Sequence, residues 1–230
     1  MIALLGSISL YVHIIAGGLT LLTGPIAIFY NFRDPQRHRI VGKTFFYAMF
    51  VVAITAILGF FKHPDVVFFQ FLLGISMLVL AGIFRGIRAI YLMKGARVLP
   101  FDFFYTGLLG LDGLYMLSMS VKHFQAGTMI AFPILFGVFG LMAIIDTRVG
   151  WGVFTKPRSL HRLDWMRLHA ITMMGAFIAS TTAFTVNAVH FLPWWVQWFG
   201  PTLLILPMQF YFGKKLRSMR DKTLSANAAT

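Results

Sequence analysis

The stretch that decides the fold is Tyr11–Lys43, YVHIIAGGLTLLTGPIAIFYNFRDPQRHRIVGK. It joins a long apolar segment to a short, strongly basic loop. On a helix, one face of the apolar segment is small and polar: it carries His13, Gly17, Thr20 and Gly24. A helix with small residues and one ionisable group on a single face, and apolar residues elsewhere, is suited to pack against other helices in lipid. The stretch therefore indicates a polytopic membrane protein.

The composition points the same way. Hydrophobic residues make up 58% of the 230 residues, charged residues only 12%, and the mean hydropathy is +0.78. Soluble domains are about 45–50% apolar and about 25% charged. A spanning helix needs about 20 apolar residues, so a chain of this length holds about seven spans and no sizeable soluble domain. The net charge of +13 lies in short loops between apolar runs, so we expect no nucleic-acid partner.

The apolar periodicity predicts an all-α bundle of seven transmembrane helices in a single domain, 1–223, followed by a disordered tail, 224–230. The helices are expected at 3–30, 44–62, 66–93, 101–121, 124–147, 165–190 and 194–213. The basic residues fall after the first helix, at the end of the third, before the sixth and in the tail; only Lys62 and Lys122 lie elsewhere. By the positive-inside rule the N-terminus is outside and the C-terminus is cytoplasmic.

Several kinds of chemistry are disfavoured by the residue types. The chain has no cysteine, which excludes disulfides, iron–sulfur clusters and Cys-ligated metals. Its seven acidic residues are all aspartates, which disfavours carboxylate-rich di-iron sites. No HExxH, GxSxG or phosphate-binding glycine motif is present. We predict no metal site and assign no catalytic residue, and whether the protein is an enzyme stays open.

Charged residues inside spans are costly and mark function or a buried pair. Arg85 and Arg88 lie in the third helix, Asp102 at the start of the fourth, and Asp112 near mid-membrane. We expect Asp112 to meet Arg85 across this hairpin, either as a structural ion pair or as part of a proton or substrate pathway with Asp102. Arg88 is expected to extend its side chain towards the interface.

Histidines mark a second candidate region. The sixth helix carries a small and polar stripe: His169, Thr172, Ala176, Ser180, Ala183, Asn187 and His190. We expect this stripe and the one on the first helix to line one cavity, with His13 and His169 facing it. The alternative is that each histidine is a hydrogen-bonded packing residue.

On the cytoplasmic side, His38 and Arg39, together with Arg85, Arg88 and Arg167, are expected to form a basic vestibule. Such a vestibule suits a phosphate, a lipid head group, a carboxylate or haem propionates. The alternative is that these charges set the topology and bind anionic lipids. Asp164 is expected to cap the sixth helix.

These residues carry a family resemblance. The chain resembles the bacterial predicted membrane proteins grouped as domain of unknown function 2306. The resemblance lies in His13, the Gly24–Pro25 step, His38-Arg39 with Gly42, and the group Trp165, Arg167 and His169. The resemblance implies a compact helical protein of a bacterial inner membrane. It singles out His13, His38, Arg39, Gly42 and His169, and it implies no particular activity.

Three functions follow as hypotheses. The first is a multi-pass inner-membrane protein that binds b-type haem or a quinone, with His13 and His169 as ligands and Arg85 or Arg88 neutralising propionates. The second is a proton-coupled carrier that uses Asp112. The third is a non-catalytic accessory subunit of a larger membrane complex. Expected partners are membrane lipids, including anionic lipids at the cytoplasmic face, and a homo-oligomer or a larger assembly.

Overall fold

A computed structural model describes residues 2–157 and 160–228. Within these ranges the chain is entirely helical, with seven helices and no strand. They are α1 (Ile2–Tyr30), α2 (Pro35–Lys62), α3 (Val67–Met93), α4 (Pro100–Gln125), α5 (Ala131–Thr155), α6 (Arg162–Ala188) and α7 (Trp194–Ala228). The predicted all-α, seven-helix fold is confirmed.

Five helices are long and apolar enough to cross a membrane: α1, α2, α3, α5 and α6. The chain is therefore a multi-pass membrane protein by length and composition. α4 and α7 fall outside this set. α4 carries Asp102 and Asp112, and the apolar half of α7 is interrupted by Gln197, Pro201 and Pro207. That both cross the bilayer, and which end faces the cytoplasm, stay predictions.

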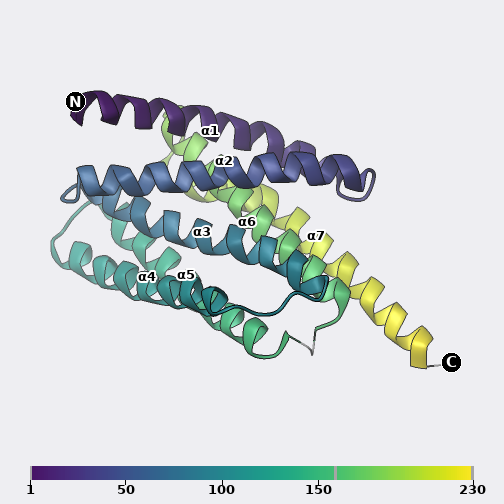
Figure 1. The fold of residues 1–230 in the computed structure, drawn as a ribbon. Coiled ribbons are helices and arrows are strands. Elements are labelled where there is room, and N and C mark those ends of the chain that lie inside the picture. The colour runs from purple at the N-terminus through teal and green to yellow at the C-terminus, as the bar shows by residue number, and fades with distance from the viewer. Residues whose placement is uncertain (1, 158–159, 229–230) are drawn as a thin grey trace.

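The helices form an elongated bundle in which α3 is central (Figure 1). α1 and α2 lie side by side along one flank, and α4 and α5 pair on the other. α3 contributes to all three hydrophobic clusters of the core, through Phe71, Val79, Ile83 and Ala89 among others. The termini lie at opposite ends of the bundle (Figure 1), as an odd number of crossings requires.

Five helix boundaries differ from the prediction by four residues or more; one is the end of α5, at Thr155 rather than 147. α2 begins at Pro35 rather than near 44, because Asp34 accepts hydrogen bonds from the backbone N–H groups of Gln36 and Arg37 (both 3.0 Å) and proline suits the first turn. The basic segment that contains His38 is thus helical.

α4 ends at Gln125, beyond its predicted end at 121 and beyond position 124, where the next helix was expected to begin. The chain then turns at Gly127, whose φ of 63° is the left-handed conformation that glycine adopts without strain, and α5 starts at Ala131. α7 continues through Ala228, into the stretch 224–230 for which a disordered tail was predicted. Residues 229–230 of that stretch, and Arg158 of the predicted basic segment, lie outside the described residues.

Candidate functional site

Two histidines from different helices meet near one end of the bundle. The rings of His38, in the first turn of α2, and His169, in the second turn of α6, have centroids 6.2 Å apart and planes at 80°. Both residues are half-buried. The pair brings together two segments that are far apart in the sequence.

Hydrogen bonds fix the orientation of both rings. Nδ1 of His38 lies 2.9 Å from the carbonyl oxygen of Ala27, and Nδ1 of His169 lies 2.9 Å from that of Gly86. Because a carbonyl oxygen only accepts, Nδ1 carries the proton in both rings. In the neutral imidazoles Nε2 then keeps its lone pair. This is the arrangement that metal-binding histidines adopt, in which the second nitrogen is held by a backbone carbonyl.

The expected pairing of His13 with His169 is wrong. His13 binds the hydroxyl of Thr55 on α2 through Nδ1 (2.7 Å). The Thr55 hydroxyl already donates to the carbonyl of Val51 (2.8 Å), so His13 is the donor. At about 1.5 Å per residue, His13 lies roughly 21 Å along α1 from Ala27, which marks the level of the His38–His169 pair. His13 therefore joins α1 to α2 and has no part in that pair.

The expected contact between Arg85 and Asp112 is also wrong. Arg85 forms an ion pair with Asp146 on α5, and its Nη1 donates to the backbone carbonyl of Asp146 (3.0 Å). Its side chain is only 3% exposed. α3 packs against both α4 and α5 at this level, and the carboxylate that reaches Arg85 is on α5. Sequence reasoning gave Asp146 no role; its place in an apolar helix was the available signal.

Arg88 pairs with Asp102, which is completely buried. Nε and Nη2 of Arg88 donate to the two carboxylate oxygens of Asp102 (2.6 and 2.7 Å). Nη2 also reaches the carbonyl of Arg97 (2.7 Å), and Asp102 accepts from the backbone N–H of Leu99 (2.8 Å). The pair therefore fixes the turn between α3 and α4. Asp102 acts here as a structural anchor of that turn.

The predicted vestibule is split into two regions by these pairs. Arg85 and Arg88 are paired with aspartates of α5 and α4, so their charges are already neutralised, whereas the His38–His169 pair lies between α2 and α6. Arg39 and Arg167 are exposed cations next to that pair in sequence. The expected capping by Asp164 is confirmed, since its carboxylate accepts from the backbone N–H of His161 (3.1 Å).

Asp112 is a buried carboxyl group with an unsatisfied oxygen. It is 7% exposed, and Oδ2 has no hydrogen-bond partner within the described part of the chain. The same holds for Nε of Arg85 and the hydroxyl of Tyr105. A buried polar atom without a partner is costly, so each of these atoms is a candidate contact for water or a ligand.

The surroundings of the His38–His169 pair combine close packing with open space. A Cβ placed on Gly86 would lie 2.6 Å from Oγ1 of Thr172, so α3 and α6 touch where the carbonyl of Gly86 holds His169. By contrast, a Cβ on Gly42, one turn along α2 from His38, or on Gly82, one turn along α3 from Gly86, would meet nothing within 4 Å.

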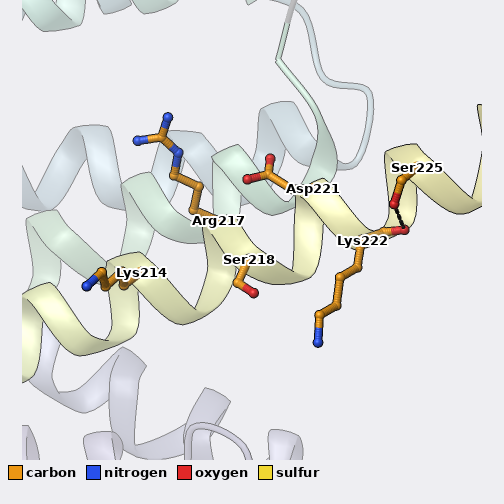
Figure 2. Close-up of a pocket in the computed structure, with 6 residues that line it drawn as sticks. All are labelled: Lys214, Arg217, Ser218, Asp221, Lys222 and Ser225. Carbon is orange, nitrogen blue, oxygen red and sulfur yellow. Dashed lines mark hydrogen bonds between the residues drawn. The ribbon is translucent and has the colours of Figure 1, made fainter.

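Other places in the described residues fit a ligand less well. No group of three or more His, Cys, Asp or Glu side chains in residues 2–157 and 160–228 is placed to hold a metal ion. A hollow of about 440 Å³ lies along α7. Figure 2 shows that its lining residues, from Lys214 to Ser225, all come from this one helix. It is a surface groove that encloses nothing.

Comparison with known proteins bears on the first half of the chain. Residues 10–97 match the family described as predicted membrane protein (DUF2306). The match is to the same family that the sequence resembles, and it covers less than half of the chain. The DUF2306 region contains His13, His38, Arg39 and Gly42, and it ends before His169. No curated protein and no solved structure matches the chain.

Proposed function

We propose that the chain is a membrane-embedded haem protein in which His38 and His169 are the axial ligands of one b-type haem. The observation that carries the proposal is the ring geometry, 6.2 Å between centroids with planes at 80°. Two imidazoles on opposite sides of one metal, with metal–nitrogen bonds of about 2 Å, have ring centroids roughly 6 Å apart.

The number of protein ligands favours haem over a bare metal ion. Structural and catalytic metal ions usually take three or four protein ligands. The described residues supply only a histidine pair here. A porphyrin fills four positions around its iron and needs only axial ligands from the protein. The bound haem would supply one-electron chemistry, and the protein would supply the axial ligands and their orientation.

The residues around the pair fit a porphyrin. A Cβ added at Gly42, one turn from His38, or at Gly82, one turn from Gly86, would meet no atom within 4 Å, so neither position carries a side chain in the way of a ligand. Exposed Arg39 follows His38 directly and is the candidate to neutralise a propionate. The carbonyls of Ala27 and Gly86 hold the proton on Nδ1 and leave Nε2 of each ring for the iron.

The test is the absorption spectrum of protein purified from haem-replete cells or reconstituted with haemin. We expect one haem per chain, with a Soret band that shifts on reduction with dithionite. H38A and H169A should each lose the six-coordinate low-spin spectrum, whereas H13A should keep it. His13 is the matched control because it is also a half-buried histidine hydrogen-bonded through Nδ1.

A rescue experiment separates ligation from packing. In H169G, added imidazole should restore the low-spin spectrum, since it replaces the missing axial ligand, whereas a packing residue would give no spectral response. The proposal is overturned if the folded protein takes up no haem, or if H38A and H169A bind it as the wild type does. A colourless protein that retains quinone on purification would assign the His38–His169 site to quinone instead.

A second candidate function rests on Asp112. Its unpartnered Oδ2, buried within the α3–α4–α5 region, supports the carrier hypothesis because a carboxyl group in that position can take up and release a proton. The test is proton influx into liposomes under an imposed potential, followed with an internal pH dye. D112N should abolish the influx and D65N, in the exposed α2–α3 turn, should leave it unchanged. Equal influx in both variants would remove Asp112 from any transport role.

A further inference from the structure

A cavity of about 1090 Å³ opens at the end of the bundle where α3 ends and α4 begins. It is lined by the α3–α4 loop and by residues where α5 ends and α6 begins. Neither His38 nor His169 is among its described lining residues, so this cavity is separate from the histidine pair. Its volume slightly exceeds the range for small-molecule sites, about 300–1,000 Å³.

The wall formed by the α3–α4 loop has a defined shape. Arg88 holds the carbonyl of Arg97, and Asp102 holds the N–H of Leu99. Gly95 has a φ of 90°, a conformation that other residues rarely adopt. These contacts fix the backbone of Arg97, whose side chain lines the cavity.

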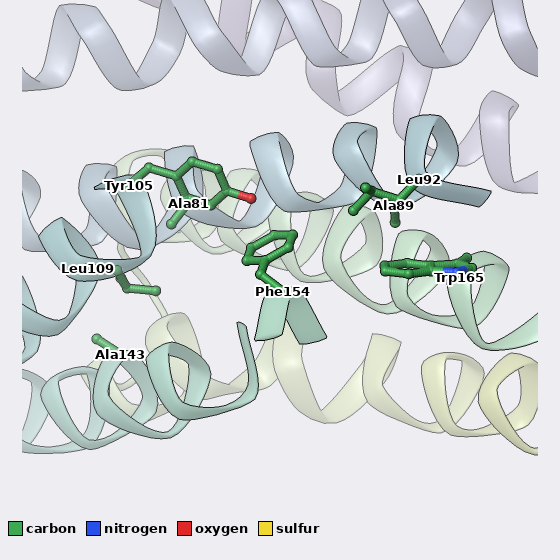
Figure 3. Close-up of a cluster of buried hydrophobic side chains, with 8 residues drawn as sticks. All are labelled: Ala81, Ala89, Leu92, Tyr105, Leu109, Ala143, Phe154 and Trp165. Atoms are coloured by element: carbon green, nitrogen blue, oxygen red, sulfur yellow. The ribbon is translucent and has the colours of Figure 1, made fainter. Parts of the chain in front are cut away.

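The floor of the cavity is rigid and apolar. Leu92, Phe154 and Trp165 line it, and all three belong to one buried cluster with exposed fractions of 8% or less. Figure 3 shows Trp165 near Ala89 and Leu92, with Phe154 between Trp165 and Tyr105. Phe103 packs against the same cluster and also lines the cavity. Such a floor suits a hydrocarbon chain.

The charged groups of the lining are basic. Arg97, in the α3–α4 loop, and Arg162, the first residue of α6, line the cavity and are both exposed. The described lining contains no acidic residue. These residues stand at helix ends, the level at which lipid head groups lie if the helices cross the bilayer. A ligand for this site therefore combines a negative head with an apolar chain.

We propose that this cavity binds one anionic phospholipid, with Arg97 and Arg162 at its phosphate head group and one acyl chain against Leu92, Phe103 and Phe154. Charge complementarity favours an anionic head over a zwitterionic one, and the apolar floor favours a lipid over a free anion. The proposal is independent of haem binding, because the two sites share no described lining residue.

The first test is native mass spectrometry of the full chain in mild detergent with added phosphatidylglycerol or phosphatidylcholine. One phosphatidylglycerol should remain bound at an affinity at least about tenfold above that of phosphatidylcholine. R97Q/R162Q should remove this preference. The control R33Q/K43Q removes the same charge from exposed positions at the same end of the bundle, and it should keep the preference.

Three outcomes would overturn the proposal. Equal retention of the two lipids would mean an unspecific apolar site. An equal loss in R97Q/R162Q and R33Q/K43Q would mean a general charge effect. Displacement of the lipid by glycerophosphate at similar concentration would mean that the site recognises a free anion.

The second test reports the acyl chain directly. Trp165 lines the cavity floor, and the other four tryptophans, 151, 194, 195 and 198, can be replaced by Phe to leave it as the single fluorophore. Phosphatidylglycerol with brominated acyl chains should quench Trp165, and R97Q/R162Q should weaken the quenching. Unchanged fluorescence in a folded single-tryptophan variant would contradict a chain in the cavity.

Discussion

At the scale of single residues, the two arginines of α3 show how burial decides the value of an ion pair. Arg88 and Asp102 form two short hydrogen bonds, and the Asp102 side chain is 0% exposed. Breaking a buried pair from one side leaves an uncompensated charge, which costs far more than breaking a pair in water. Arg37 and Asp34 form the opposite case, with side chains 65% and 37% exposed.

We therefore expect R88M to lower the free energy of unfolding by about 3–5 kcal/mol. R37M should lower it far less than R88M does, because solvent screens the exposed pair. The measurement is denaturant or thermal unfolding in mild detergent. In R88M/D102N the unpaired carboxylate is gone, so part of the lost stability should return. If R88M and R37M cost the same, the Arg88–Asp102 pair is not buried as described.

The sequence identifies the important charged residues of the bundle, but it does not identify their partners. The cost of charge in lipid identifies Arg85, Arg88, Asp102 and Asp112 as important from the sequence alone. Their pairing depends on which helices are neighbours, and α3 has both α4 and α5 within reach. The hairpin α3–α4 made Asp112 the obvious partner for Arg85, whereas Asp146 of α5 occupies that position.

At the scale of helices, the contact between α3 and α6 sets the position of His169. A Cβ on Gly86 would lie 2.5 Å from Cε of Met173 and 2.6 Å from Oγ1 of Thr172. Met173 is flexible and can move, but Thr172 is buried and its hydroxyl binds the carbonyl of Leu168 (2.9 Å). Any side chain at position 86 therefore pushes the two helices apart.

We expect G86A to destabilise the fold by about 1–3 kcal/mol, the usual cost of overpacking. Because the carbonyl of Gly86 holds His169, the same variant should weaken haem binding. The control is G107A in α4, away from the His38–His169 pair, where an added Cβ meets nothing within 4 Å and the helix gains about 0.5–1 kcal/mol from the loss of glycine. Unfolding and haem titration of both variants give the comparison; similar values for the two would contradict the α3–α6 contact.

Helix ends were harder to predict than helix cores. The basic residues after Asp34 predict a loop, so the sequence places the start of α2 near 44. The helix starts at Pro35, and Asp34-Pro35 is a typical helix start. This matters for the site, since it places His38 on a helix face that α6 can reach. Hydropathy identifies the buried middle of a span, whereas its ends depend on single capping residues.

At the scale of the whole molecule, the topology depends on whether α4 and α7 cross the bilayer. α4 has 26 residues and is about 39 Å long, more than the roughly 30 Å of a hydrocarbon core. Both of its aspartates are buried inside the bundle, where lipid does not reach them. The apolar part of α7 packs along α6 and is tied to it by Gln209, whose side chain donates to the carbonyl of Ile171 (2.9 Å).

The absence of cysteine from the sequence allows a direct test of the topology, since any introduced thiol is the only one. The positive-inside rule predicts that the N-terminal side of the bundle faces outwards. On that prediction we expect a membrane-impermeant maleimide to label Q125C and F191C on intact cells. A96C and S218C should be labelled only after the membrane is opened. All four positions are exposed.

Labelling of Q125C and A96C from the same side would mean that α4 does not cross the bilayer. Labelling of F191C and S218C from the same side would mean that α7 does not cross it. Labelling of all four in the reverse pattern would keep seven crossings and invert the orientation, which would place the arginines of the lipid cavity and the His38–His169 pair on the outer side.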